Sequence, residues 1–201
     1  MNNFNNINFS YSTLNINTLT NIINNRDIAF IGYSNVGKST IINILLNKKI
    51  AYVSKIPGST LFINVFENSK KKIRFLDFPG YGYNKFIKKY KFKYYNILRK
   101  YLKYKNSLKL VILLIDIRNF LKEIDLIILK KIIFYKKPVL LILNKTDKIS
   151  KKNIQNNKIK IIKILKKKLN NLFLNNIKII TFSSVKKKNL KKIRHYINYW
   201  I

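Results

Sequence analysis

The chain has no cysteine, and its 201 residues include only five glycines, three prolines, one histidine and seven acidic side chains. The absence of cysteine excludes disulfide bonds and cysteine-ligated metals, and it suits a reducing compartment. Uncharged apolar runs such as 110–115 and 139–143 are too short to span a bilayer. Residues 1–25 carry no charged side chain, so they lack the basic start of a secretory signal. We therefore expect a cytoplasmic protein without a membrane segment.

Because acidic residues are scarce, lysine and arginine give the chain a formal net charge of +35. Such a charge favours contact with the phosphates of nucleic acid. However, Lys, Asn, Ile, Tyr and Phe are abundant throughout, and an extremely AT-rich genome imposes that pattern on every protein it encodes. The charge therefore supports an RNA or another anionic partner without identifying one.

Alternating strand and helix patterns predict the fold class. Because central apolar runs are continuous and segments of helical spacing separate most of them, we expect an α/β protein with helices on both faces of a mostly parallel sheet. The turn at 67–72 is too short for a crossover, so the two strands around it should form an antiparallel hairpin, with one antiparallel strand at the edge. The predicted strands lie near 27–31, 61–66, 73–78, 109–115, 138–143 and 177–182. A basic surface helix is predicted within 148–176.

The scarce glycines gather in segments suited to phosphate binding. A loop between a predicted strand and a predicted helix fits G-x-x-x-x-G-K-[ST] and reads Gly32-Tyr33-Ser34-Asn35-Val36-Gly37-Lys38-Ser39, followed by Thr40. Glycines let amide N–H groups wrap a β-phosphate, and the helix N-terminus adds partial positive charge. Lys38 would bridge the β- and γ-phosphates, and the Ser39 hydroxyl would ligate Mg²⁺. The pattern predicts a nucleoside triphosphate site.

A second motif predicts which base is bound. The four residues after the predicted strand 138–143 fit N-K-x-D and read Asn144-Lys145-Thr146-Asp147. An ionised Asp147 accepts from the N1–H and N2–H₂ donors of guanine, whereas adenine offers no such pair. A solvated turn carboxylate is the alternative. Ser183 and Ser184 follow the last predicted strand, which ends at Phe182, and a backbone N–H there would face guanine O6.

A third motif predicts a γ-phosphate sensor. The predicted strand 73–78 ends in D-x-x-G, which reads Asp77-Phe78-Pro79-Gly80. Asp77 would hold Mg²⁺ through water, and the Gly80 amide would contact the γ-phosphate. The segment Pro57-Gly58-Ser59-Thr60 lies between this motif and the phosphate loop, where a switch threonine is expected. The expected metal ligands are Ser39, Thr60 and Asp77.

The remaining ionisable residues suggest structural roles. Asp116 and Arg118 follow a predicted strand, and with Glu123 and Asp125 they should cap or tether the next helix rather than perform chemistry. The single histidine, His195, lies among basic residues on the final predicted helix. A surface or packing role is expected there.

These motifs, together with Lys122-Glu123-Ile124-Asp125, resemble the EngB family, also called YihA or YsxC, of TRAFAC-class P-loop GTPases. The most specific part of the resemblance is the block DFPGYGY at 77–83. The resemblance runs from about Arg26 to the C-terminus and leaves residues 1–25 as an unassigned extension. It implies a three-layer, Ras-like GTPase that assembles the large ribosomal subunit. Its expected partners are the subunit precursor and rRNA, with no DNA specificity and no membrane, and a monomer is expected. At three positions this chain departs from the family pattern. Family members commonly carry Arg where Tyr33 stands, a basic residue at the position of Ser59 and Gln at the position of Leu61.

The resemblance also implies a mechanism. Asn35, Lys38, Thr60 and Gly80 are the expected contributors to hydrolysis, and Asn35 resembles the loop asparagine that in some relatives binds K⁺ beside the phosphates. Tyr81 stands where many GTPases place a water-orienting Gln, so intrinsic hydrolysis should be slow. GTP with Mg²⁺ is expected to order 57–60 and 80–93. Basic and aromatic residues alternate between 85 and 105, as rRNA contact requires, although aromatics at helical spacing also suit a core.

Two other functions remain open from the sequence. A basic RNA-binding scaffold would use its nucleotide site only to stabilise the fold. A related GTPase would act in tRNA modification or at membranes, although no further RNA-binding domain or membrane helix is seen after the expected GTPase core.

Overall fold

A computed structural model describes residues 4, 6–20, 25–53, 62–82, 88–104, 106–169 and 176–201. Within these ranges, strands and helices mostly alternate, and β1 is the strand that the apolar runs do not predict. The strands are β1 (Asn8–Thr13), β2 (Arg26–Gly32), β3 (Ile63–Asn68), β4 (Ile73–Asp77), β5 (Leu108–Asp116), β6 (Val139–Asn144) and β7 (Ile177–Thr181). The helices are α1 (Ile16–Thr20), α2 (Lys38–Leu46), α3 (Lys88–Tyr104), α4 (Glu123–Phe134), α5 (Lys151–Lys168) and α7 (Leu190–Trp200), with a 3₁₀ turn η1 (Thr146–Lys148).

The described strands form one mixed sheet in the order β1-β3-β4-β2-β5-β6-β7. Neighbours from β4 to β7 in this order pair in parallel, and β3 pairs antiparallel with both β4 and β1. The central strand β5 is buried at every position except Lys109 and Asp116. Burial on both faces explains its continuous apolar sequence. The expected α/β class with a mostly parallel sheet is confirmed.

β1 takes the edge position that the sequence assigns to the strand near 61–66. β3 is the antiparallel strand, but β1 pairs with its outer side. β1 reads Asn-Phe-Ser-Tyr-Ser-Thr and is mostly exposed, so its apolar pattern is too weak to predict a strand. Phe4, Ile7 and Leu19 are nevertheless buried in the cores of the protein. The described part of the N-terminal extension is therefore built into the same fold.

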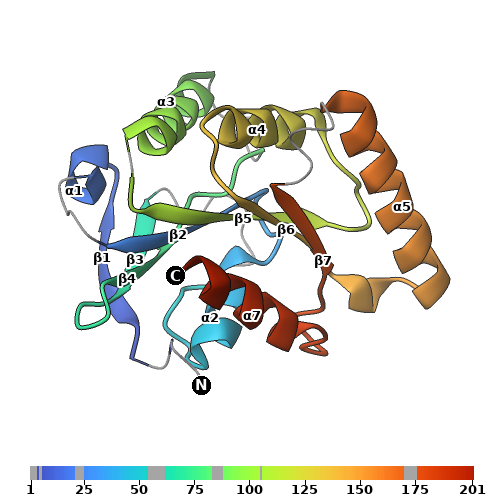
Figure 1. The fold of residues 1–201 in the computed structure, drawn as a ribbon, viewed down its shortest axis with the longest axis horizontal. Coiled ribbons are helices and arrows are strands. Elements are labelled where there is room, and N and C mark those ends of the chain that lie inside the picture. The colour runs from blue at the N-terminus through green and yellow to red at the C-terminus, as the bar shows by residue number, and fades with distance from the viewer. Residues whose placement is uncertain are drawn as a thin grey trace.

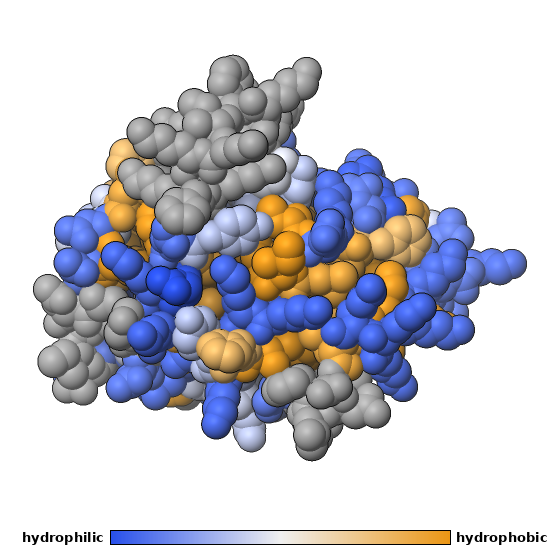
Figure 2. Space-filling view, turned by 90° about the horizontal axis from the view of Figure 1, so that it is seen from above, coloured by the Kyte–Doolittle hydropathy of each residue, from blue (hydrophilic) through white to orange (hydrophobic). Residues whose placement is uncertain are grey.

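Helices cover both faces of the sheet (Figure 1). Side chains of α3, α4 and α5, with Leu19 of α1, pack in one core, whereas side chains of α2 and α7 pack in the other. Figure 2 shows the face with α3, α4 and α5, where apolar side chains gather over the middle and hydrophilic ones lie to the left and right of them. Among the described helices, none combines the length and the apolar character that crossing a membrane requires.

The sheet brings the three motifs to one edge. The phosphate loop follows β2, the D-x-x-G segment begins at the end of β4, and the N-K-x-D segment begins at the end of β6. These strands are parallel members of one sheet. Since the carboxyl ends of parallel strands meet at the same edge, the loops converge there, which is where open α/β sheets bind ligands.

Candidate guanine nucleotide site

The phosphate loop turns sharply between β2 and α2. Gly37 has a φ of +103° in the left-handed region, and a Cβ placed there would lie 2.6 Å from Nδ2 of Asn144. That amide donates a 2.9 Å hydrogen bond to the carbonyl of Val36. The position therefore requires glycine for both its backbone conformation and its contact. The N-K-x-D asparagine thus braces the loop, a role its motif does not reveal.

Lys38 begins α2 with its side chain only 8% exposed. Its Nζ lies 3.3 Å from the carbonyl oxygens of Gly32 and Tyr33, to which it donates. Burial lowers the pKa of Lys38, and the negative charge of Asp77 partly opposes that shift. A buried cation against the loop is placed to bind a polyanion.

Ser39 and Asp77 form the part of the site suited to a metal ion. The Ser39 hydroxyl donates to Oδ2 of Asp77 at 2.7 Å. Asp77 is 1% exposed, and its Oδ1 has no hydrogen-bond partner among the described residues. Burial raises the pKa of this carboxyl, although Lys38 and Ser39 oppose the shift. A hydroxyl and an unsatisfied carboxylate oxygen are hard oxygen ligands, so this pair fits Mg²⁺.

The D-x-x-G segment lies directly against the phosphate loop. The Phe78 amide donates to the Phe30 carbonyl at 3.0 Å, which continues the pairing of β4 beyond its end. Two residues further on, a Cβ at Gly80 would lie 2.6 Å from Oγ of Ser34. Only glycine therefore allows this approach, and it places the Gly80 backbone beside the loop that should hold the phosphates.

The two segments that are expected to read the base also meet. The Thr146 hydroxyl donates to the Phe182 carbonyl at 2.9 Å, and the Ser183 hydroxyl donates to Oδ1 of Asp147 at 2.8 Å. The Ser184 hydroxyl donates to Oδ1 of Asn144 at 3.2 Å. The chain segments 144–147 and 182–184, separate in sequence, thus form one wall of the site.

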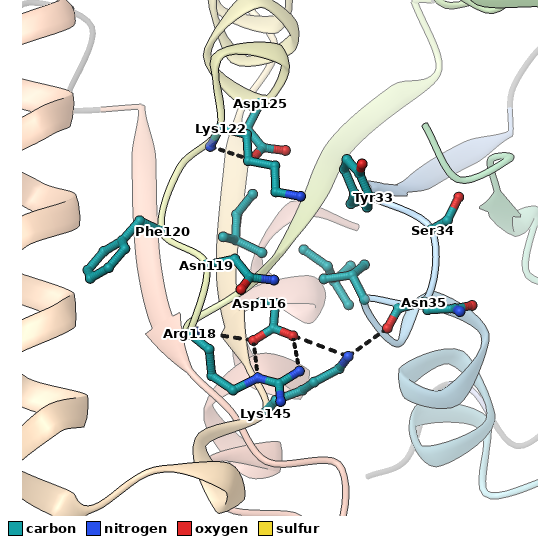
Figure 3. Close-up of a pocket in the computed structure, with 13 residues that line it drawn as sticks. Tyr33, Ser34, Asn35, Asp116, Arg118, Asn119, Phe120, Lys122, Asp125 and Lys145 are labelled. Atoms are coloured by element: carbon teal, nitrogen blue, oxygen red, sulfur yellow. Dashed lines mark hydrogen bonds and ion pairs between the residues drawn. The ribbon is translucent and has the colours of Figure 1, made fainter. Parts of the chain in front are cut away.

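Asp116 belongs to the site, which its sequence position does not suggest. Its Oδ2 accepts from Arg118 at 2.7 Å and lies 3.2 Å from Nζ of Lys145, and that Nζ donates to the Asn35 carbonyl at 2.7 Å (Figure 3). Burial raises the pKa of Asp116, but bonds from Arg118 and the charge of Lys145 outweigh it, so the pKa lies below its ordinary value. The sequence assigns Asp116 to capping the next helix. It instead ties Lys145 to the phosphate loop.

Asp125 does cap α4, as predicted, because its Oδ2 accepts from the Lys122 amide at 2.8 Å. Its other oxygen accepts from the Tyr81 hydroxyl at 2.6 Å, a bond across 44 residues that the sequence does not indicate.

The expected switch residues 57–60 lie outside the described residues, as do 83–87 and 105. Thr40 lies in the first turn of α2, next to Ser39.

The arrangement of these loops at one sheet edge defines a P-loop GTPase. Residues 27–145 match the family described as 50S ribosome-binding GTPase. Over 149 residues the chain is 39% identical to a probable GTP-binding protein EngB of Blochmanniella pennsylvanica, covering 74% of this chain and 72% of that protein. A Buchnera aphidicola (subsp. Schizaphis graminum) protein of the same name is 43% identical over 147 residues, covering 73% and 70%. The chain belongs to the EngB family of GTP-binding proteins.

A solved structure shows a related fold with ligands. Era, crystallised in complex with MgGDPNP and nucleotides 1506–1542 of 16S ribosomal RNA, superposes with a TM-score of 0.67 at 27% identity. The match covers 87% of this chain and 56% of the Era chain, so this chain spans just over half of Era's length.

Proposed function

We propose that this GTPase is a Mg²⁺-dependent switch that acts in assembly of the large ribosomal subunit, with the subunit precursor and its rRNA as partners. The convergence of the phosphate loop, D-x-x-G and N-K-x-D segments at one sheet edge carries the switch part. The family match, described as 50S ribosome-binding, supports the ribosomal part. The bound rRNA in the Era structure supports contact with RNA.

Each motif has a defined task in this proposal. The amides of the phosphate loop and Lys38 hold the phosphates, and Asp147 accepts from guanine with the 182–184 segment beside it. Ser39 and Asp77, joined by Thr60 when GTP is bound, would hold Mg²⁺, and the ion would offset negative charge on the phosphates. Gly80 donates its amide to the γ-phosphate.

Hydrolysis transfers the γ-phosphoryl group of GTP to water, breaking the bond between the γ-phosphorus and the β–γ bridging oxygen and releasing GDP and phosphate. Tyr81, which replaces the usual glutamine, is 5% exposed and its hydroxyl is bonded to Asp125. The side chain is therefore committed to α4 rather than to an attacking water, which supports slow intrinsic hydrolysis.

We infer K⁺ assistance from Asn35, whose side chain is exposed at the loop while its carbonyl accepts from Lys145. A K⁺ ion beside the phosphates would stabilise the charge that develops in the transition state. Hydrolysis with ribosomal particles should be about tenfold or more faster in K⁺ than in Na⁺, and Asn35→Ala should remove the difference. Asn156→Ala, at an exposed position on α5, is the matched control. Equal rates in both salts would contradict this assignment.

Asp77 should show opposite effects on stability and function. Because burial raises its pKa, folding favours the protonated form and the charged carboxylate destabilises the empty protein at neutral pH. Asp77→Asn should therefore raise the melting temperature without nucleotide by roughly 2–4 °C, the shift that ~1 kcal/mol produces at this size. The same variant should lose the Mg²⁺ dependence of GTP binding.

Asp116→Asn is the comparison for this prediction. The pKa of Asp116 lies below its ordinary value, so its charge stabilises the fold above that pKa, and this variant should melt lower. Thermal melts in EDTA measure both variants. A lower melting temperature for Asp77→Asn would show that its charge is stabilising and contradict the assignment of an unsatisfied metal ligand.

The ribosomal role is tested by co-sedimentation with large-subunit precursor particles. Binding should be strong with a non-hydrolysable GTP analogue and weak with GDP. It should weaken as salt rises, because lysines line exposed positions of α5. Equal binding with GTP analogue, GDP and no nucleotide would favour the RNA-binding scaffold instead.

A further inference from the structure

Tyr81 joins the γ-phosphate sensor to helix α4. Its side chain is 5% exposed, and its hydroxyl donates to Oδ1 of Asp125 at 2.6 Å. Asp125 is 2% exposed and uses its second oxygen to accept from the Lys122 amide at the start of α4. One buried carboxylate therefore serves both the D-x-x-G segment and the helix N-terminus.

The backbone of Tyr81 is bonded to the phosphate loop. The Ser34 amide donates to the Tyr81 carbonyl at 3.0 Å, and the Tyr81 amide lies 3.4 Å from the Gly32 carbonyl. The preceding residue, Gly80, packs against Ser34 too closely for any side chain. Tyr81 is hydrogen-bonded through its backbone to the phosphate loop and through its hydroxyl to Asp125. Even a small movement of Gly80 should therefore also move Tyr81.

A second contact reinforces the first. The ring of Tyr33 packs edge-on against that of Tyr81, with centroids 5.9 Å apart, and its hydroxyl donates to the Gly82 carbonyl. Nζ of Lys122 lies 3.8 Å from the centre of the Tyr33 ring. In Figure 3 the Lys122 side chain extends toward Tyr33 across the pocket between the phosphate loop and α4. The start of α4 thus touches both the phosphate loop and, through Tyr81, the γ-phosphate sensor.

We propose that Asp125 is a positioning residue: by holding Tyr81, it places Gly80 for the γ-phosphate and couples α4 to the nucleotide state. The proposal rests on the GTP switch proposed above. GDP has no γ-phosphate for Gly80 to meet, so only GTP uses this restraint. A ligand shifts a two-state element by its differential affinity, and the coupling is reciprocal. Asp125 should therefore set the preference for GTP over GDP and leave GDP affinity unchanged.

A structural role for Asp125 makes a different prediction. If Asp125 only caps α4, removing the Tyr81 hydroxyl leaves the cap intact and changes no nucleotide affinity. Tyr81→Phe separates the two roles because it deletes one hydroxyl and keeps the ring in place. Asp125→Asn retains an oxygen for the Lys122 amide but removes the charge that strengthens the bond with Tyr81.

The neighbouring tyrosine provides a matched control. Tyr94 packs on the Tyr81 ring with centroids 6.0 Å apart, and its buried hydroxyl has no hydrogen-bond partner among the described residues. Tyr94→Phe therefore makes the same chemical change beside Tyr81 without breaking a link to α4. It should leave both nucleotide affinities as they are.

The test measures the affinities of fluorescent N-methylanthraniloyl GDP and the corresponding non-hydrolysable GTP analogue. Tyr81→Phe should reduce the preference for the GTP analogue over GDP about tenfold, and Asp125→Asn should reduce it in the same direction. GDP affinity should stay within about twofold of the parent value, because the restraint acts only through the γ-phosphate. Hydrogen exchange of amides 123–126 should differ between the two nucleotides in the parent protein and become equal in Tyr81→Phe.

The outcomes distinguish this proposal from the function on which it rests. A parent protein that binds neither guanine nucleotide overturns the GTP switch itself. A parent protein that prefers the GTP analogue, with Tyr81→Phe and Asp125→Asn matching it in preference and in exchange at α4, overturns the coupling alone. An equal loss of GDP and GTP affinity in Tyr81→Phe also overturns it, because that result indicates general disruption of the site.

Discussion

Replacing Asp147 with asparagine should lower the affinity for GTP about a hundredfold or more and create a preference for xanthosine triphosphate. The carboxylate of Asp147 is expected to accept from two guanine donors, and charge-assisted bonds contribute about 1.5–3 kcal/mol each. An asparagine offers an N–H₂ group to the O2 acceptor of xanthine, where guanine has its own N–H₂ donors. The substitution should not disturb the fold, since the amide oxygen can still accept from the Ser183 hydroxyl.

Calorimetric titration with GTP, ATP and xanthosine triphosphate measures this change. Glu123→Gln, at an exposed position of α4, removes an acidic charge without touching the site and should bind GTP as the parent does. If the parent protein bound ATP as tightly as GTP, or if Asp147→Asn kept full GTP affinity, guanine would not be read by this residue.

Lys38→Ala should reduce the affinity for both GTP and GDP about a hundredfold or more. The ammonium group is buried against the phosphate loop, where hydrogen bonds to phosphate oxygens form in low dielectric and gain strength from charge. Because burial lowers the pKa of Lys38, the empty protein gains little from the charge, so the fold should tolerate alanine. Equilibrium binding measures the loss, and a melting curve without nucleotide verifies the fold.

The same variant tests the ribosomal role. Lys38→Ala should abolish the GTP-dependent part of particle binding. Lys130 is an exposed lysine of α4, and Lys130→Ala should reduce particle binding only as much as the loss of any single surface charge would. A Lys38→Ala protein that binds guanine nucleotides normally would remove Lys38 from the phosphate site. If its RNA affinity were intact and GTP had no effect even on the parent, the scaffold function would stand.

The parts of the fold that the sequence predicts are those with strong local signals. β5 and β6 are buried on both faces, so their apolar runs are unambiguous, and the short turn after β3 correctly indicates an antiparallel pair. β1 escapes prediction because an edge strand exposes most of its residues and needs few apolar ones. Its position depends on pairing with β3, at least 50 residues away in sequence, which no local pattern encodes.

The same distinction applies to the site. Gly37, Lys38 and Asp147 lie in motifs whose spacing predicts a nucleotide site, and the structure places those motifs at one edge of the sheet. Asp116 is different, because its contact with Lys145 follows from the register in which it pairs with Asn144, at the ends of β5 and β6. The bond between Tyr81 and Asp125 likewise depends on the packing of α4 over the sheet. Strand register and helix packing are long-range properties. They determine the contacts of Asp116 and of Tyr81 with Asp125, which the motifs do not predict.

The position of β1 at the outer edge of the sheet has a consequence for the behaviour of the molecule in solution. Ser10 and Ser12 donate hydroxyl hydrogen bonds to Glu67 and Asn64 across β1 and β3, and the register shifts between Phe9 and Tyr11. A short, polar, irregular outer strand is a poor template for recruiting a strand from another molecule. By pairing with the outer side of β3, β1 covers backbone groups that could otherwise pair with a strand of another molecule. We therefore expect β1 to reduce aggregation.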